Sequence, residues 1–223
     1  MPYAFLCDFD GTVSPHDVGA RFVRRFAAGP EAESSALLRR WRAGELGHRA
    51  LTEAECARVR ATESEALAFT REFRLDPGFA PFVREALGRG DAVMVVSVGF
   101  DFYVRDLLAR AGLGELPWAA NRARFENGRV LPEYPFADAG CRDCGNCKAQ
   151  HVRRYQALGY HVALVGDGMS DRCGARAADT VLARGDLLGW CRREGIAATP
   201  FAHFDEVADA ARRFAVTAPL RRS

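Results

Sequence analysis

A short apolar run near the N-terminus, ending in Asp-Phe-Asp-Gly-Thr, constrains the fold more than any other feature of the chain. The run Ala4–Val13 has the length and the turn signal of a buried strand. Asp8 and Asp10 are two residues apart and share a face, whereas Phe9 turns toward the core. Gly11 permits a tight turn and lets a ligand approach the backbone. A solvated turn is the alternative, but two acids at a buried strand end require a neutralising cation.

Later segments repeat this pattern of strand, polar turn and helix. Residues 92–96 end at Ser97, and residues 160–165 end at Gly-Asp-Gly-Met-Ser-Asp. Strand alternating with helix is typical of an α/β fold with a doubly wound parallel sheet. Asn127-Gly128 predicts a hairpin within residues 124–131. We expect further strands at 117–121 and 180–183, and helices at 77–87 (with Asp76 as N-cap), 100–111, 148–158, 187–194 and 204–214.

Residues 14–76 interrupt this alternation. They carry no strand signal and are rich in Ala, Arg and Glu. Asp17 can cap a helix that ends at Gly29-Pro30, and residues 31–43 and 48–73 predict two or three more helices. The segment is far longer than an ordinary loop. We expect an α/β core formed by residues 1–13 and 77–223, with a helical cap, residues 14–76, inserted over the site.

Composition narrows the class of protein. The chain has 223 residues, of which 48% are hydrophobic, and a formal net charge of +2. Because no basic block is present, we expect no nucleic-acid partner. No apolar run is long enough to span a membrane, and the N-terminus lacks the layout of a signal peptide. We expect a cytoplasmic protein with no membrane partner, and its oligomeric state stays open.

One lysine stands out. Lys and Arg together number 31, yet Lys148 is the only lysine. An ammonium is a compact point charge, whereas a guanidinium is a planar fork. A lysine that persists in so arginine-rich a chain indicates a position that arginine cannot fill, so Lys148 is a candidate functional residue. The alternative is chance survival at the surface.

The polar turns should meet. Strand ends of a parallel sheet lie on one edge, where such sheets bind ligands. Carboxylates without imidazole or thiolate favour a hard cation, and Mg²⁺ is the first candidate. The residues expected to converge there are Asp8, Asp10, Ser97, Lys148, Asp167 and Asp171.

This set resembles the motifs of the haloacid dehalogenase-type phosphatases in order and spacing, and the helical insert resembles the cap of their phosphoserine-phosphatase-like branch. A looser resemblance, to methionine-salvage phosphatases acting on a hydroxyketo-methylthiopentenyl phosphate, runs through the second half. The core motifs are Asp8-Phe9-Asp10-Gly11-Thr12, Ser97, Lys148 and Gly166-Asp167-Gly168-Met169-Ser170-Asp171; the looser ones are residues 97–104, 144–148 and 183–188.

The resemblance implies a role for each of these residues. Asp8 would be the nucleophile and Asp10 the general acid and base. Ser97 and Lys148 would hold phosphoryl oxygens. Asp171 would orient Lys148 or a metal-bound water, or else be a helix N-terminal acid. Asp8, the Asp10 carbonyl and Asp167 would bind Mg²⁺, and Gly11 and Thr12 would support the turn. Val98 departs from the family, which often has Gly after the motif serine.

Substrate selection should fall to the cap. His16 and Asp17 follow the nucleophile turn, and we expect both to face the substrate. Arg49 and Trp41 are further candidates on the cap side. Each has a structural alternative: Asp17 as a helix N-cap, Arg49 as a solvated charge and Trp41 as cap core. His48 shows no feature that suggests a role.

The cysteine cluster allows several interpretations. Cys141, Cys144 and Cys147 have the spacing of metal ligands, and a tetrahedral zinc site would need a fourth ligand, for which His151 is the nearest candidate. We favour reduced thiols over a zinc site or a disulfide.

The leading functional prediction is a Mg²⁺-dependent phosphatase that hydrolyses a small phosphomonoester through an aspartyl-phosphate. A methionine-salvage substrate is one possibility, and a phosphoserine phosphatase or broad sugar-phosphate phosphatase is the alternative. The non-enzymatic alternative is an inactive phosphate- or metal-binding module, which the retention of both Asp8 and Asp10 disfavours.

Overall fold

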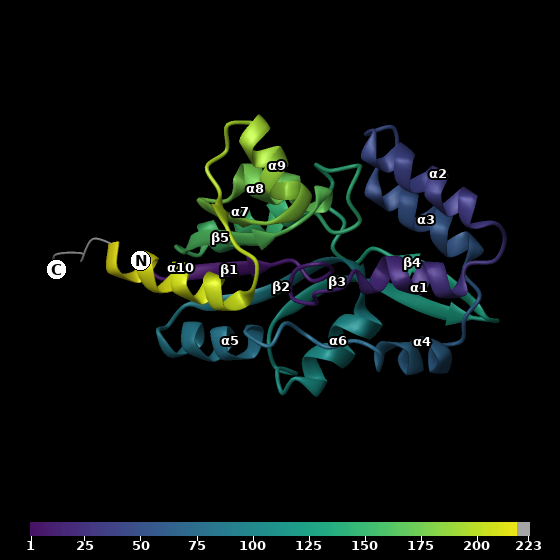
Figure 1. Cartoon of the computed structure of the whole chain (residues 1–223), viewed down its shortest axis with the longest axis horizontal. Coiled ribbons are helices and arrows are strands. Elements are labelled where there is room, and N and C mark those ends of the chain that lie inside the picture. Colours follow the sequence, from purple (N-terminus) through teal and green to yellow (C-terminus); the bar gives the residue numbers. More distant parts are fainter. Residues whose placement is uncertain (218–223) are drawn as a thin grey trace.

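A single seven-stranded sheet forms the centre of the molecule (Figure 1). The computed structural model describes residues 1–217. The strand order is β4-β3-β2-β1-β5-β6-β7, and every neighbouring pair is parallel except β3 and β4. The strands are β1 (Tyr3–Cys7), β2 (Ala92–Phe100), β3 (Trp118–Glu126), β4 (Arg129–Glu133), β5 (His161–Gly166), β6 (Thr180–Ala183) and β7 (Thr199–Pro200).

Helices cover both faces of this sheet, which confirms the doubly wound α/β fold. Phe5 of β1 packs in one core and Leu6 in the other, because successive strand residues point to opposite faces. The Phe5 side is covered by α5 (Phe79–Gly88), α6 (Asp101–Arg110) and α10 (Phe204–Thr217), and the Leu6 side by α7 (Lys148–Ala157), α8 (Arg172–Ala177) and α9 (Gly185–Arg193).

Strand β1 lies in the middle of the sheet. It pairs in parallel with β2 on one side and β5 on the other, with Leu6 opposite Met94 and Leu164. Such a strand is buried on both faces, which explains its unbroken apolar sequence. The N-terminal run therefore places the Asp-Phe-Asp turn at the centre of the sheet edge.

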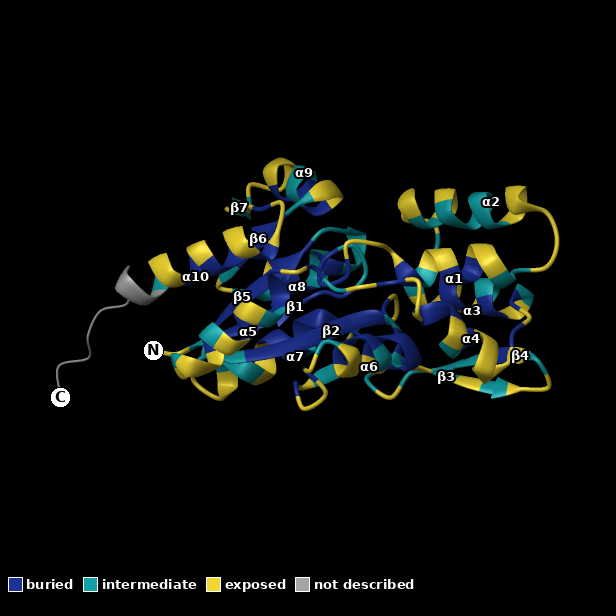
Figure 2. Ribbon diagram, turned by 60° about the horizontal axis from the view of Figure 1, so that its bottom comes forward, coloured by how far each residue is buried: buried dark blue, intermediate teal, exposed yellow. Residues whose placement is uncertain are grey.

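Four helices form the segment between β1 and α5. They are α1 (Val18–Phe26), α2 (Glu31–Arg42), α3 (His48–Arg58) and α4 (Glu63–Thr70). Asp17 caps α1 by accepting a 2.7 Å hydrogen bond from the N–H of Ala20. The β3–β4 hairpin extends along this group of helices (Figure 2), and α3 packs on β4. Helix α4 packs on α6 and lies on the other side of the hairpin from α2 and α3 in Figure 1.

Several boundaries differ from the sequence prediction. Helix α5 begins at Phe79 rather than Pro77, because the Asp76 carboxylate accepts the Gly78 N–H (2.9 Å) in a turn before the helix. Strand β2 continues to Phe100 through an irregular register with β3. The expected strand at 117–121 and the first hairpin arm are one continuous strand.

Among residues 1–217, no helix combines the length and apolar character needed to cross a bilayer.

Candidate active site

Asp8 follows β1 directly, and the sheet fixes its backbone. Its N–H donates to the carbonyl of Val165 in β5 (2.8 Å), and its side chain is 4% exposed. Phe9 points into the apolar core and packs against Tyr103. Alternation along the strand thus directs Asp8 away from that core, toward the side of the sheet covered by α7.

Lys148 is the first residue of α7 and is completely buried. Its ammonium forms ion pairs with both Asp8 and Asp171. Burial favours the neutral amine, but the charges of Asp171 and Asp8 outweigh it and raise the pKa of Lys148. Lys148 is therefore a fixed positive charge beneath the Asp8 carboxylate.

Asp171 connects Lys148 to the turn after β5. One carboxylate oxygen accepts from Lys148, and the other accepts the backbone N–H groups of Asp167 (3.1 Å) and Gly168 (2.9 Å). Asp171 has no exposed surface. The same side chain therefore positions both the ammonium and the Gly-Asp-Gly turn.

Three carboxylates form a cluster of oxygen ligands beside Lys148. Oxygens of Asp8, Asp167 and Asp171 all lie within 4.8 Å of one another. Burial and the Asp171 charge raise the pKa of both Asp8 and Asp167, so the cluster needs more positive charge than Lys148 provides. These hard ligands fit Mg²⁺, which takes one or two carboxylates and fills its remaining positions with water or phosphate oxygens.

The turn of residues 10–12 packs tightly against Asp167. Gly11 has φ +79°, and a Cβ there would lie 2.5 Å from Asp167 Oδ2. The Thr12 hydroxyl donates to Asp167 Oδ1 (2.8 Å). Arg184 lies in a stretch of looser family resemblance but had no predicted role. It donates to the Gly11 carbonyl through Nε (2.9 Å) and also to the carbonyl of Thr12. Any side chain at position 11 would displace the Asp167 carboxylate.

Asp10 has a separate environment, outside the three-carboxylate cluster. Its Oδ1 accepts the N–H groups of Val18 (2.8 Å) and Gly19 (3.2 Å), and its Oδ2 accepts the Tyr103 hydroxyl (2.6 Å). Burial, with a smaller effect from the Asp17 charge, raises the pKa of Asp10 to about 7. A carboxyl with this pKa can donate and accept a proton near neutral pH.

Ser97 lies beside Asp10 in the second half of β2. Its hydroxyl is 3.5 Å from Asp10 Oδ2 and accepts the Gly99 N–H (2.9 Å). Asn146, which lies in a stretch of looser family resemblance but had no predicted role, donates to the Ser97 carbonyl (2.9 Å), and Asn121 donates to the Val98 carbonyl (2.6 Å). Two buried amides thus fix the backbone around the motif serine.

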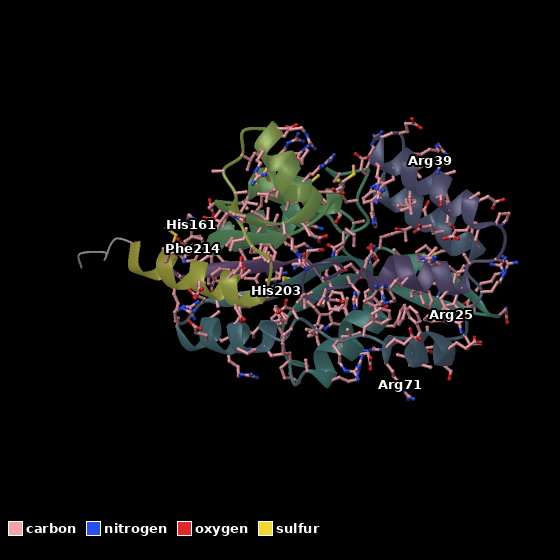
Figure 3. All side chains as sticks on the ribbon, in the orientation of Figure 1. Arg25, Arg39, Arg71, His161, His203 and Phe214 are labelled. Carbon is pink, nitrogen blue, oxygen red and sulfur yellow. The ribbon has the colours of Figure 1, made fainter. Side chains whose placement is uncertain are left out.

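The cavity above these residues is small, about 150 Å³. Its floor includes Asp8, Asp10 and Asp167, and its roof comes from α1, α2 and α3. No arginine or lysine is among the described residues that line it. Figure 3 labels Arg25 of α1, Arg39 of α2 and Arg71, which directly follows α4; all three are exposed. The apolar part of the roof consists of Ala20, Val23, Leu38, Trp41, Leu51 and Cys56.

The predicted cap-side residues divide into two groups. Asp17 and Trp41 line the cavity. His16 and Arg49 are not among its lining residues, and their expected role in substrate selection stays a prediction. His16 is exposed and contacts Arg21 (3.3 Å). Arg49 bonds Glu53 one turn along its helix (3.1 Å), and its guanidinium lies 4.5 Å from the centre of the Tyr134 ring.

Two cavity residues of α3 were missed from the sequence. Burial, aided by the Lys148 charge, lowers the pKa of His48 to about 4, so its imidazole is neutral at pH 7. Burial, with the Asp17 charge, raises the pKa of Glu55 to about 7. His48, Leu51 and Glu55 are spaced three and four residues apart, which places them on one helix face. That spacing was the signal available in the sequence.

The cysteine cluster lies outside the cavity. All seven cysteines are free thiols, so the described structure contains no disulfide. The fourth partner of Cys141, Cys144 and Cys147 is Cys173 of α8, not His151. His151 is instead 2.7 Å from Asn146 Oδ1 through Nε2. Hydrogen bonds from Cys144 and Cys147 lower the pKa of Cys173 to about 3.

Comparison with known proteins agrees with this geometry. The profile of haloacid dehalogenase-like hydrolases matches residues 5–176. The chain is 30% identical over 205 residues to the 2-hydroxy-3-keto-5-methylthiopentenyl-1-phosphate phosphatase of Brevibacillus brevis, covering 91% of each chain. It is 33% identical over 221 residues to the enzyme of that name from Geobacillus kaustophilus, covering 95% of this chain and 96% of the relative.

Solved structures share the fold. A phospho-aspartyl intermediate analogue of phosphoserine phosphatase superposes with a TM-score of 0.74 at 20% identity, covering 94% of this chain and 98% of the other. A hydrolase from Salmonella enterica superposes with a TM-score of 0.73 at 19% identity, covering 93% of this chain and 70% of the other. Because its curated relatives are named as phosphatases, the protein is a phosphoric monoester hydrolase. The chain belongs to the haloacid dehalogenase-like hydrolase family.

Proposed function

We infer that the protein is a Mg²⁺-dependent phosphatase that cleaves 2-hydroxy-3-keto-5-methylthiopentenyl-1-phosphate through an aspartyl-phosphate. The observation that carries this proposal is a small cavity, roofed by apolar side chains and free of arginine and lysine among its described lining residues, directly above Asp8 and Asp10. Two curated relatives that carry the name of this activity support the substrate.

In the first step, an Asp8 carboxylate oxygen attacks phosphorus, and the bond from phosphorus to the ester oxygen breaks. Asp10 gives its proton to the departing oxygen, which leaves as an alcohol or enol. Repulsion between the Asp8 charge and one phosphate charge at 4 Å is about 4 kcal/mol at an effective dielectric of 20. The ammonium of Lys148, paired with Asp8, offsets part of this repulsion.

In the second step, Asp10, now ionised, takes a proton from water, and the water oxygen attacks phosphorus. The phosphorus–Asp8 bond breaks and restores the carboxylate. The pKa of Asp10 near 7 suits both directions of proton transfer, because general catalysts work best when their pKa lies near the working pH. Asp8 and Asp167 would hold Mg²⁺, which when bound supplies positive charge to the transferring phosphoryl group.

The lining of the cavity favours an apolar tail over the head group of phosphoserine. Asp17 and Glu55 could pair with the ammonium of phosphoserine, but its carboxylate would find no arginine or lysine among the described lining residues. A methylthio tail would instead bury its surface against Val23, Leu38 and Trp41, which contributes about 0.8 kcal/mol per buried methylene-sized group. A broad sugar-phosphate phosphatase would need more polar groups at the same positions.

A phosphate-release assay with Mg²⁺ tests the proposal. The parent should hydrolyse the methylthiopentenyl phosphate with a much higher kcat/KM than phosphoserine or glucose 6-phosphate. Asp8→Asn, which keeps the shape of the side chain, should be inactive toward all three. Equal turnover of phosphoserine would refute the substrate but not the chemistry. An Asp8→Asn variant as active as the parent would refute the chemistry, and a parent that binds phosphate without turnover would indicate a binding module.

A further inference from the structure

Four cysteine side chains meet about the start of α7, away from the catalytic cavity. Cys141, Cys144 and Cys147 come from the irregular segment 134–147, and Cys173 comes from α8. Their sulfur atoms all lie within 4.8 Å of one another. Sulfurs bound to one zinc at about 2.3 Å stand about 3.8 Å apart in a tetrahedron. We propose that these four thiolates bind a structural zinc ion.

The four thiolates complete the coordination of a zinc ion without any further ligand from the protein. Four thiolates fill a tetrahedral zinc site and leave no open position, which is typical of structural rather than catalytic zinc. Cys144 and Cys147 are nearly buried, and Cys141 and Cys173 are half-buried. None of the four forms a disulfide, so every sulfur is available to the metal.

The surroundings suit the charge of such a site. Zinc with four thiolates carries a net charge of −2. The surface cleft next to the sulfurs contains three arginines and two acids, and so has an excess of positive charge. This cleft, which Cys141, Cys147 and Cys173 also line, gives the metal a route from solvent. The arginines are Arg142, Arg153 and Arg176.

The segment that supplies three of the ligands has few other interactions that would stabilise its conformation. Residues 134–147 contain no helix or strand, and the apolar cluster around them consists of sulfur and alanine side chains. Irregular segments of this length usually serve a function or are mobile. Zinc binding would stabilise the segment because structural metal sites contribute folding free energy directly.

The site would also stabilise catalytic groups that it does not touch. Cys147 is the N-cap of α7 and immediately precedes Lys148. Cys173 is two residues after Asp171, the partner of Lys148. Asn146, which lies between Cys144 and Cys147 in the sequence, donates hydrogen bonds to the carbonyls of Ser97 (2.9 Å) and Ala119 (3.1 Å). The metal would tie α7 to α8 and fix the Lys148–Asp171 pair.

Elemental analysis of the protein, purified without chelator from zinc-supplemented cells, tests the proposal. We expect about one zinc per chain, retained through dialysis against a Mg²⁺ buffer. Replacing zinc with Co²⁺ should give the intense visible bands of a tetrahedral cobalt thiolate. A zinc-selective chelator should lower the unfolding temperature, and Zn²⁺ should restore it.

Variants separate the cluster from other thiols. Cys141→Ser changes the half-exposed loop ligand and should fold yet lose zinc to a chelator that the parent withstands. Cys191→Ala, at a buried cysteine outside the cluster, should keep its zinc. A folded parent without zinc and without cobalt thiolate bands would overturn the proposal, as would iron with labile sulfide, or a disulfide among these cysteines in fresh protein. These readouts do not depend on phosphatase activity.

Discussion

The Tyr103 hydroxyl donates a 2.6 Å hydrogen bond to Asp10 Oδ2, while two backbone N–H groups at the start of α1 donate to Asp10 Oδ1. These hydrogen bonds favour the carboxylate and lower the pKa of Asp10, whereas burial and the Asp17 charge raise it to about 7. The acid–base character of Asp10 is therefore a balance that single substitutions can shift in either direction.

Tyr103→Phe and Asp17→Asn should shift the pH profile of kcat/KM in opposite directions. Activity should fall as pH rises through the pKa of Asp10, because the first step needs its proton. Tyr103→Phe removes a hydrogen bond to the carboxylate and should move this alkaline limb up by about one pH unit. Asp17→Asn removes a repelling charge but keeps a capping oxygen, and should move the limb down. Shifts of the same sign would contradict this account.

Asp10→Asn should stall the reaction between its two steps. With p-nitrophenyl phosphate the leaving group needs little protonation, so Asp8 should still be phosphorylated. Hydrolysis of the intermediate should slow by about 10²- to 10⁴-fold, the usual contribution of a general base. Rapid-quench measurement should show a burst of about one p-nitrophenolate per site. Asp8→Asn is the control and should give no burst.

The same Asp10→Asn variant should be more stable than the parent at alkaline pH. Because folding raises the Asp10 pKa from its ordinary 3.8 to about 7, the folded state resists ionisation. The resulting destabilisation develops as pH rises from about 4 to 7 and is absent below pH 4. Thermal unfolding should therefore favour the variant at pH 8 and show little difference at pH 4. A constant difference would rule out Asp10 ionisation as its cause.

Lys148 should tolerate neither a larger nor a neutral side chain. Lys148→Arg overfills a completely buried site, which typically costs about 1–3 kcal/mol. Lys148→Met leaves Asp8 and Asp171 without their cation, and breaking a buried pair in this way costs about 3–5 kcal/mol. Both variants should lose activity. Urea unfolding should show the Met variant recovering stability as the pH falls, because Asp8, whose pKa burial raises, can then protonate; the Arg variant should recover less.

Val23→Thr should separate tail binding from chemistry. The substitution keeps the shape of Val23, 7% exposed at the cavity wall, but adds a hydroxyl against the expected tail. Weaker contact with one methyl-sized group should lower kcat/KM about 10-fold for the methylthiopentenyl phosphate. Ethyl phosphate lacks the tail and should be hydrolysed as by the parent. An equal loss for both substrates would mean that Val23 affects the reacting groups.

The sequence was most informative where a single local pattern determines a position. The apolar run into Asp8 predicted the central strand, because a strand buried on both faces needs unbroken apolar sequence. The alternation of strand and helix likewise predicted the doubly wound sheet, now confirmed. The isolation of Lys148 among arginines singled out a side chain that is completely buried between Asp8 and Asp171.

Contacts between distant segments were harder to foresee. Tyr103 and Arg184 reach the turn after Asp8 from 93 and 173 residues away. Both lie in stretches of looser family resemblance, but nothing in those stretches indicated which turn they contact. Cys173 joins the other cysteines only because α7 and α8 pack side by side. Arg49, a cap-side candidate from the sequence, is not among the residues that line the cavity, because its guanidinium contacts Glu53 and the ring of Tyr134 instead. The expected division into core and cap remains a prediction.

The burial of Lys148 gives the protein an internal reporter. Apart from the α-amino group, the chain's only primary amine is sealed between two carboxylates. Amine-directed reagents such as succinimidyl esters should therefore modify no side-chain amine of the folded protein. They should acylate Lys148 only when α7 separates from the sheet. Mass spectrometry of that one peptide would then follow the opening of the catalytic centre.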